Sequence, residues 1–153
     1  MLRFLTVLPL VLLPALAAAQ EDPVATVSDC EWQASAWNLA EPWEQNTRTF
    51  SNGKTRLAVL DTIEPAIAWA HILVLSPPYS EIGDRQCKTI GLDGMGFGGI
   101  RFEELTSSYD PATGLSFTVP VQAYNMAIGD IDWYSLRFTL NQATGEISTG
   151  LSQ

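Results

Sequence analysis

The stretch LSFTVPVQA, residues 115–123, alternates apolar and polar side chains, and so does YSLRFTL, residues 134–140. Such alternation places the apolar side chains on one face of a β-strand, because successive side chains point to opposite faces. The turn motifs DPATG at 110–114 and NQATG at 141–145 adjoin these stretches and supply a glycine suited to positive φ. The sequence therefore predicts two half-buried strands of an antiparallel sheet. Since Pro120 lacks an N–H, the first strand should lie at a sheet edge or carry a bulge.

Strand and turn signals continue through the rest of the chain. Asn52-Gly53 separates two short runs and predicts a hairpin, because both residues tolerate positive φ. AIAWAHILVLS, residues 66–76, is apolar on both alternating faces and ends at Pro77-Pro78, which predicts a central buried strand. In all, further strands are expected at 46–51, 54–61, 66–76, 86–91 and 146–149.

One short helix is expected near the N-terminus. Ser28 and Glu31 match the capping box S-x-x-E, in which each side chain caps the other's backbone N–H. This motif predicts a helix over 29–37, which Pro42 prevents from extending far. For residues 101–108, a strand and a helix both fit the spacing of the apolar side chains.

The 153 residues are enough for one domain and too few for two. Short strands separated by turns predict a mainly β chain, a single-domain antiparallel β-sandwich or barrel with one short N-terminal helix. We expect this domain to span 29–153, after a loose acidic arm at 20–28.

Residues 1–19, MLRFLTVLPLVLLPALAAA, have the parts of a secretory signal peptide: a basic start, a short apolar centre and an A-x-A end. The apolar part is shorter than the roughly 20 residues that a spanning helix needs. We therefore expect cleavage after Ala19, a mature chain that begins at Gln20, and no membrane span after cleavage. No asparagine starts an N-x-Ser/Thr site, which favours bacterial export and a periplasmic or secreted protein.

The charge of the chain excludes one class of partner, and its two cysteines predict a disulfide. Eight basic and 17 acidic side chains give a net charge of −9, so nucleic acid is not an expected partner, because its phosphates would be repelled. The two cysteines, Cys30 and Cys87, most often pair in an oxidising compartment, and we expect them to form a disulfide.

Three tryptophans, Trp32, Trp37 and Trp43, fall within twelve residues and are possible ligand-binding residues. Exposed indole faces stack on sugar rings, which would suit a carbohydrate-binding module. The alternative is a hydrophobic lid that closes one side of the sheet. We expect the lid, with at least two of the three largely buried.

The motif Gly94-Met95-Gly96-Phe97-Gly98-Gly99 spells G-x-G-x-x-G, but no βαβ unit surrounds it, so nucleotide binding is not expected. A flexible loop, or a strand packed close to another backbone, are the two interpretations. His71 is the only histidine. Its apolar neighbours predict a buried, neutral side chain that bonds a backbone carbonyl, with no catalytic or metal role.

Acidic pairs raise two further possibilities. Asp130 and Asp132 fall on one side of an extended stretch and form a weak calcium candidate. Glu41/Glu44 and Glu103/Glu104 are pairs of the kind that glycoside hydrolysis uses, given a suitable separation across a cleft.

The sequence has one histidine, two cysteines expected to pair, no nucleophile motif and no metal cluster, so no cofactor and no enzymatic activity are expected. The leading hypothesis is an exported, non-enzymatic binding or interaction domain of a bacterial cell envelope, with a protein or glycan ligand. The alternatives are a carbohydrate-binding module, a small polysaccharide hydrolase that uses Asp/Glu, and an inhibitor of an extracellular enzyme.

Overall fold

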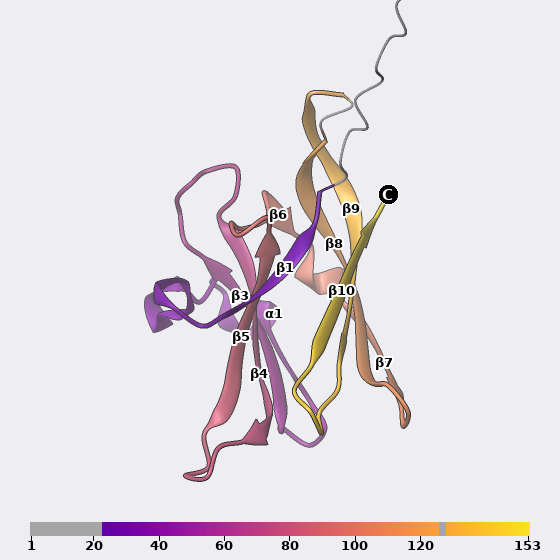
Figure 1. The fold of residues 1–153 in the computed structure, drawn as a ribbon. Helices are drawn as coiled ribbons and strands as arrows, with labels where there is room; N and C mark the ends of the chain where they lie inside the picture. Colours follow the sequence, from indigo (N-terminus) through magenta and orange to yellow (C-terminus); the bar gives the residue numbers. More distant parts are fainter. Residues whose placement is uncertain (1–22, 126–127) are drawn as a thin grey trace, which may run out of the picture.

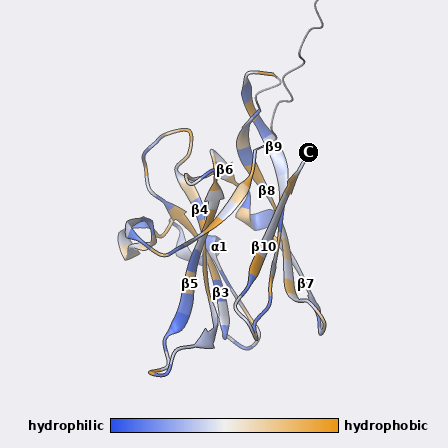
Figure 2. Ribbon diagram, viewed as in Figure 1, coloured by the Kyte–Doolittle hydropathy of each residue, from blue (hydrophilic) through white to orange (hydrophobic). Residues whose placement is uncertain are grey.

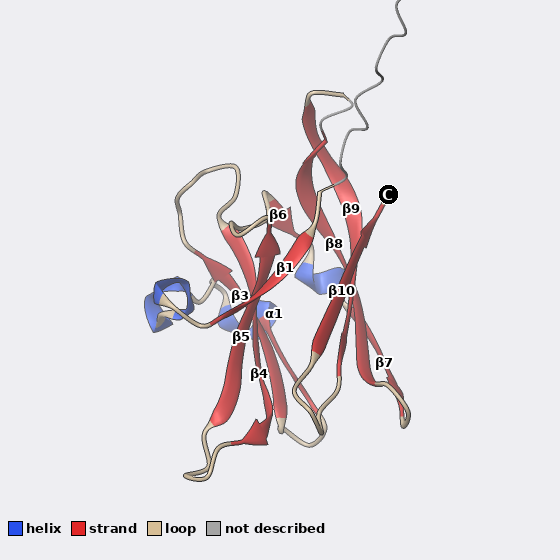
Figure 3. Ribbon diagram, in the orientation of Figure 1, coloured by secondary structure: helices blue, strands red, loops and turns tan. Residues whose placement is uncertain are grey.

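The computed structural model describes residues 23–125 and 128–153. The expected signal peptide and Gln20 lie outside these residues. Two antiparallel five-stranded sheets pack face to face as a β-sandwich (Figures 1 and 3). The expected fold class is confirmed, with the sandwich as its architecture.

The first sheet has the strand order β1-β5-β4-β3-β2. Its strands are β1 (Ala25–Asp29), β2 (Thr47–Phe50), β3 (Thr55–Asp61), β4 (Ala70–Tyr79) and β5 (Arg85–Leu92). The second sheet has the order β10-β9-β8-β6, and β7 pairs with another part of β8. Its strands are β6 (Gly99–Ile100), β7 (Thr106–Asp110), β8 (Gly114–Asn125), β9 (Asp130–Leu140) and β10 (Ile147–Ser152).

The main core lies between the two sheets, and hydrophobic and hydrophilic colours alternate along the strands that enclose it (Figure 2). The side chains that β8 and β9 bury are those of the predicted apolar faces: Leu115, Phe117, Val119, Val121, Ala123, Tyr134, Leu136, Phe138 and Leu140. The rings of Phe117 and Phe138 stack with centroids 4.8 Å apart. Here the period-two pattern predicted the buried face correctly.

Edge strands β1 and β10 lie next to each other on one side of the sandwich. The hydroxyl of Thr149 on β10 donates a hydrogen bond to the carbonyl of Ala25 on β1, at 2.8 Å. Residues 25–28 of the loose arm that we expected at 20–28 belong to strand β1, and residues 20–22 lie outside the described ones. The backbone of β1 pairs with β5 from Ala25 to Asp29.

A segment tied by the disulfide covers the outer face of the first sheet. Cys30 and Cys87 are bonded, as predicted, with their Cα atoms 5.4 Å apart. Two 3-10 turns follow Cys30 along the chain, η1 (Trp32–Ala34) and η2 (Ala36–Asn38). Ala34 and Leu39 of this segment pack on a second small core that contains Leu73 of β4.

The prediction of a helix over 29–37 is wrong, because this stretch holds the end of β1 and two 3-10 turns. Ser28 and Asp29 pair with Thr89 and Lys88 in the sheet, so Ser28 is not at a helix start and the capping box does not form. The one short α-helix of the described residues is α1 (Trp43–Asn46), directly after Pro42.

Two strand predictions also change. The central strand β4 begins at Ala70 rather than 66, because Thr62 bonds back to Trp69 and closes a loop before it. The strand continues through Pro77-Pro78 to Tyr79, with its register against β5 shifting at this point.

Pro120 lies in β8, which is neither an edge strand nor bulged against β9. On the other side of β8, β7 pairs with it only up to Thr118, and β6 pairs with it only from Val121 onward. The missing N–H of Pro120 falls in this gap. Residues 101–108, for which the sequence allowed either a strand or a helix, contain a 3-10 turn, η3 (Phe102–Glu104), and the start of β7.

Candidate functional site

A pocket of about 330 Å³ opens on the outer side of the first sheet. We call it the tryptophan pocket. Three segments form it: residues 28–33, the β3–β4 loop at 62–68, and the turn at 94–96. The first two of these segments are the purple and magenta loops on the left of Figure 1. The pocket brings together four residues that the sequence singled out: Trp32, His71, Gly94 and Gly96.

The imidazole of His71 lies deep in the tryptophan pocket. Its neighbours Ala70 and Ile72 point into the main core, so His71 points to the opposite face of β4. The side chain is buried, as predicted, with 8% of the residue exposed. Burial lowers the pKa of His71 below its ordinary value of 6.5, because a charged imidazole would lose hydration.

The carbonyl partner that we expected for His71 is not found. No hydrogen bond joins its ring to any residue that the structure describes. A neutral imidazole carries one donor and one acceptor. His71 therefore offers both functions to a molecule in the pocket.

Trp32 forms the exposed wall of the same pocket, with 64% of its surface accessible. Its backbone is held from two sides: its carbonyl accepts hydrogen bonds from the Ser35 hydroxyl at 2.7 Å and from the Asn38 amide at 3.4 Å. The neighbouring Gln33 is buried and donates to the Thr89 hydroxyl at 3.2 Å. Its Oε1 atom has no hydrogen-bond partner among the described residues.

Carboxylates surround the mouth of the pocket. Asp29 pairs with Lys88 at 2.6 Å, and one oxygen of Glu64 accepts the N–H of Ala66 at 3.1 Å. Glu31 is exposed and forms no ion pair within the described part of the chain. The local charge is therefore negative, which disfavours anionic ligands.

The glycine motif serves close packing of the backbone. The Gly96 N–H donates to the Ala68 carbonyl at 3.0 Å, and a Cβ at Gly96 would lie only 2.3 Å from that oxygen. Gly98 and Gly99 lie outside the tryptophan pocket, against Gln122 of β8. Gly94 has a φ of +81° and donates to the Thr26 hydroxyl at 3.1 Å. Close backbone packing is thus seen at Gly96, whereas a Cβ at Gly94 would have nothing within 4 Å.

The tryptophan lid that we expected is wrong. Trp32, Trp37 and Trp43 are 64%, 87% and 59% exposed. The segment does cover the sheet, but it does so with the buried amides Gln33 and Asn38 and the partly buried Ala34 and Leu39, while the indoles stay outside. Nor do the three rings line one site, since Trp43 lines a separate pocket of about 250 Å³ with Glu41 and Glu44.

The remaining acidic candidates do not gather into a site. Asp130 and Asp132 each accept a backbone N–H from the next residue, at 2.7 and 2.8 Å. Glu104 pairs with Arg101 at 3.5 Å, and its neighbour Glu103 is exposed. Within residues 23–125 and 128–153, no three His, Cys, Asp or Glu side chains come close enough to hold a metal ion.

A larger pocket, of about 630 Å³, was missed at the sequence level. It lies between the β2–β3, β7–β8 and β9–β10 turns, and we call it the turn pocket. The turn motifs themselves were recognised. In an antiparallel sandwich, the hairpin turns at one end lie close together. The recognised turn motifs could therefore have predicted that a pocket forms between them.

No protein-family model, curated protein or solved structure matches the chain.

Proposed function

We propose that the protein is an exported binding domain that holds an uncharged saccharide in the tryptophan pocket, without catalysing a reaction. The observation that carries this proposal is an exposed indole in the same pocket as a largely buried imidazole that has no hydrogen-bond partner among the described residues. Trp32 provides the first and His71 the second. This observation favours the carbohydrate-binding alternative over a domain that binds a protein.

The chemistry of the pocket suits a sugar ring. The flat C–H face of a pyranose stacks on an indole, while its hydroxyl groups both donate and accept hydrogen bonds. The neutral imidazole of His71 fills both of those functions, and the carboxylates of Glu31 and Glu64 accept from hydroxyls. The volume of about 330 Å³ lies near the lower end of the range typical of small-molecule sites, roughly 300–1,000 Å³.

Export is part of this proposal. The Cys30–Cys87 disulfide fits an oxidising compartment, and the described residues contain no helix with the length and hydrophobicity to cross a membrane. Exported material should begin at Gln20, which an intact-mass measurement checks. A mass that retains residues 1–19 would contradict this.

The binding experiment compares two tryptophans on one segment. Calorimetry with neutral cello-, xylo-, malto- and chito-oligosaccharides should find a ligand, and Trp32→Ala should weaken its binding by about tenfold or more. Trp37→Ala is the matched control, because Trp37 is more exposed and does not line the pocket. Release of reducing ends would favour the hydrolase alternative. Binding to none of these oligosaccharides, or equal effects of the two variants, would overturn the proposal.

A further inference from the structure

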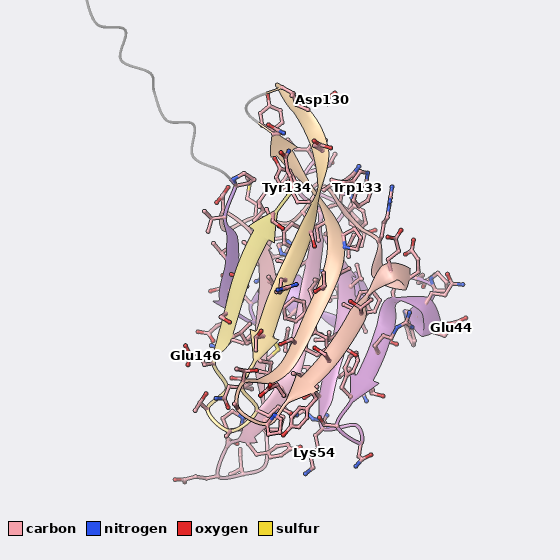
Figure 4. All side chains as sticks on the ribbon, turned by 90° about the vertical axis from the view of Figure 1, so that its right-hand side faces the viewer. Glu44, Lys54, Asp130, Trp133, Tyr134 and Glu146 are labelled. Atoms are coloured by element: carbon pink, nitrogen blue, oxygen red, sulfur yellow. A yellow bond between two sulfur atoms is a disulfide. The ribbon has the colours of Figure 1, made fainter. Side chains whose placement is uncertain are left out.

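The turn pocket is separate from the tryptophan pocket and shares no residue with it. The two pockets lie near opposite ends of strand β3. This strand begins beside the Ser51–Lys54 turn and ends at Asp61, next to the loop of the tryptophan pocket. Figure 4 shows Lys54 at one end of the sandwich and Asp130 at the opposite end.

The walls of the turn pocket are held in place by hydrogen bonds between the sheets. The amide of Gln142, on the β9–β10 turn, donates to the hydroxyl of the buried Thr55 at 2.9 Å. The Oε1 of Gln142 also accepts from the hydroxyl of Ser51, at 3.1 Å. Asp110 braces the third turn by accepting the N–H of Ala112 at 2.7 Å. The pocket is thus formed before any ligand binds.

Two tyrosine rings line the turn pocket and remain accessible. Tyr79, at the end of β4, is 48% exposed, and Tyr109, at the end of β7, is 64% exposed. Such rings have an apolar face for stacking and a hydroxyl for hydrogen bonding. Asn52 and Thr113 add polar side chains to the lining.

The charge of the turn pocket differs from that of the whole chain. The chain carries a net charge of −9, yet no carboxylate of the described residues lines this pocket, whereas Lys54 does. Lys54 forms no ion pair with any described residue. The other lysine, Lys88, is paired with Asp29. Lys54 is therefore the charged side chain that lines the turn pocket, while the carboxylate of the adjacent Asp110 accepts the N–H of Ala112.

We propose that the turn pocket binds an acidic saccharide, a chain of uronic acid units. The sugar faces stack on Tyr79 and Tyr109, the hydroxyls bond Asn52 and Thr113, and the ammonium of Lys54 pairs with a ring carboxylate. A chain of aspartate or glutamate residues would satisfy Lys54 but has no ring to stack on the two tyrosines. This inference stands independently of the function proposed for the tryptophan pocket.

The experiment titrates the oxidised protein with oligogalacturonate, with the same oligomer reduced at its carboxyl groups, and with oligoglutamate. Oligogalacturonate should bind most tightly, and added salt should weaken its binding, because an exposed charge pair is screened. Lys54→Met should abolish the preference for the acidic over the reduced oligomer. Tyr109→Ala should raise the dissociation constant of both by about tenfold.

Tyr124→Ala is the matched control, since Tyr124 is a similarly exposed tyrosine, 50% accessible, near the other end of β8. It should leave oligogalacturonate binding unchanged. Melting curves of each variant establish that it folds, and Lys54→Gln repeats the charge test if Lys54→Met does not. No binding of oligogalacturonate, equal binding of oligoglutamate, or no response to either Lys54 variant would overturn the proposal. Binding of neutral saccharides and its loss in Trp32→Ala are measured separately. The proposal for the tryptophan pocket and the proposal for the turn pocket can therefore fail independently.

Discussion

His71 is nearly inaccessible, yet it faces a pocket and has no partner within the described chain. Burial lowers its pKa, so the unfolded chain binds a proton near pH 6.5 while the folded chain still excludes it. The folded state is thereby favoured above pH 6.5, and this contribution is lost as the pH falls from 6.5 toward the lowered pKa. His71 is the only histidine, so the effect can be isolated.

We expect the free energy of unfolding to fall between pH 7.5 and 5.5 in the wild type and to fall less in His71→Gln. Urea unfolding at several pH values measures both slopes. Identical slopes in the two proteins would mean that the imidazole titrates normally in the folded state.

The exposed tryptophans predict a contrast with the core. Trp37→Ala should change the free energy of unfolding by no more than about 0.5 kcal/mol, as surface substitutions do. Phe117→Ala should cost roughly 3–5 kcal/mol, because that ring is 1% exposed and stacks on Phe138. Urea unfolding of the two variants checks this. A large loss in Trp37→Ala would restore the lid that we first expected.

Gly96→Ala should destabilise the fold, because the added Cβ would meet the Ala68 carbonyl at 2.3 Å. The expected cost is roughly 1–3 kcal/mol, typical of overpacking. Gly150→Ala in β10 is the control, since nothing lies within 4 Å of its Cβ and its φ is not positive. Equal melting temperatures for the two variants would contradict the close approach seen at Gly96.

At the scale of the elements, the disulfide holds the segment that carries Trp32 and Ala34. Cys30→Ser combined with Cys87→Ser should lower the free energy of unfolding by roughly 2–4 kcal/mol, since the 57-residue separation closes a long loop. It should also weaken saccharide binding at Trp32, because the indole loses its fixed support. Urea unfolding and calorimetry test both effects. Reduced wild-type protein serves as the second reference, and full stability after reduction would refute the expectation.

The elements differ in how far the sequence specified them. Along β8 and β9 each side chain faces the core or solvent by simple alternation, so Phe117 and Leu136 were placed correctly. The segment after Cys30 follows no such period. Its orientation depends on β1 pairing with β5 and on the disulfide, which are contacts far apart in the chain. Hydrophobicity alone therefore favoured burying the indoles, whereas the folded segment buries the amides of Gln33 and Asn38 and partly buries Ala34 and Leu39.

At the scale of the whole molecule, both pockets are made by segments that the sequence separates widely. Trp32, Glu64 and Gly96 meet only because β3, β4 and β5 lie side by side in the first sheet. The turn pocket needs both sheets, since Ser51 and Gln142 come from opposite layers. Local patterns predict strands and turns, whereas the order of the strands decides which turns meet.

The contact between Thr149 and Ala25 has a practical consequence for measurement. Through it, β1 and β10 lie together, and the described chain enters by the first and leaves by the second at the same end of the sandwich (Figure 1). The turn pocket lies at the other end, beside Lys54. A linker from residue 153 to a sensor chip would therefore anchor the molecule upright, with the tyrosines of the turn pocket facing the flowing sample.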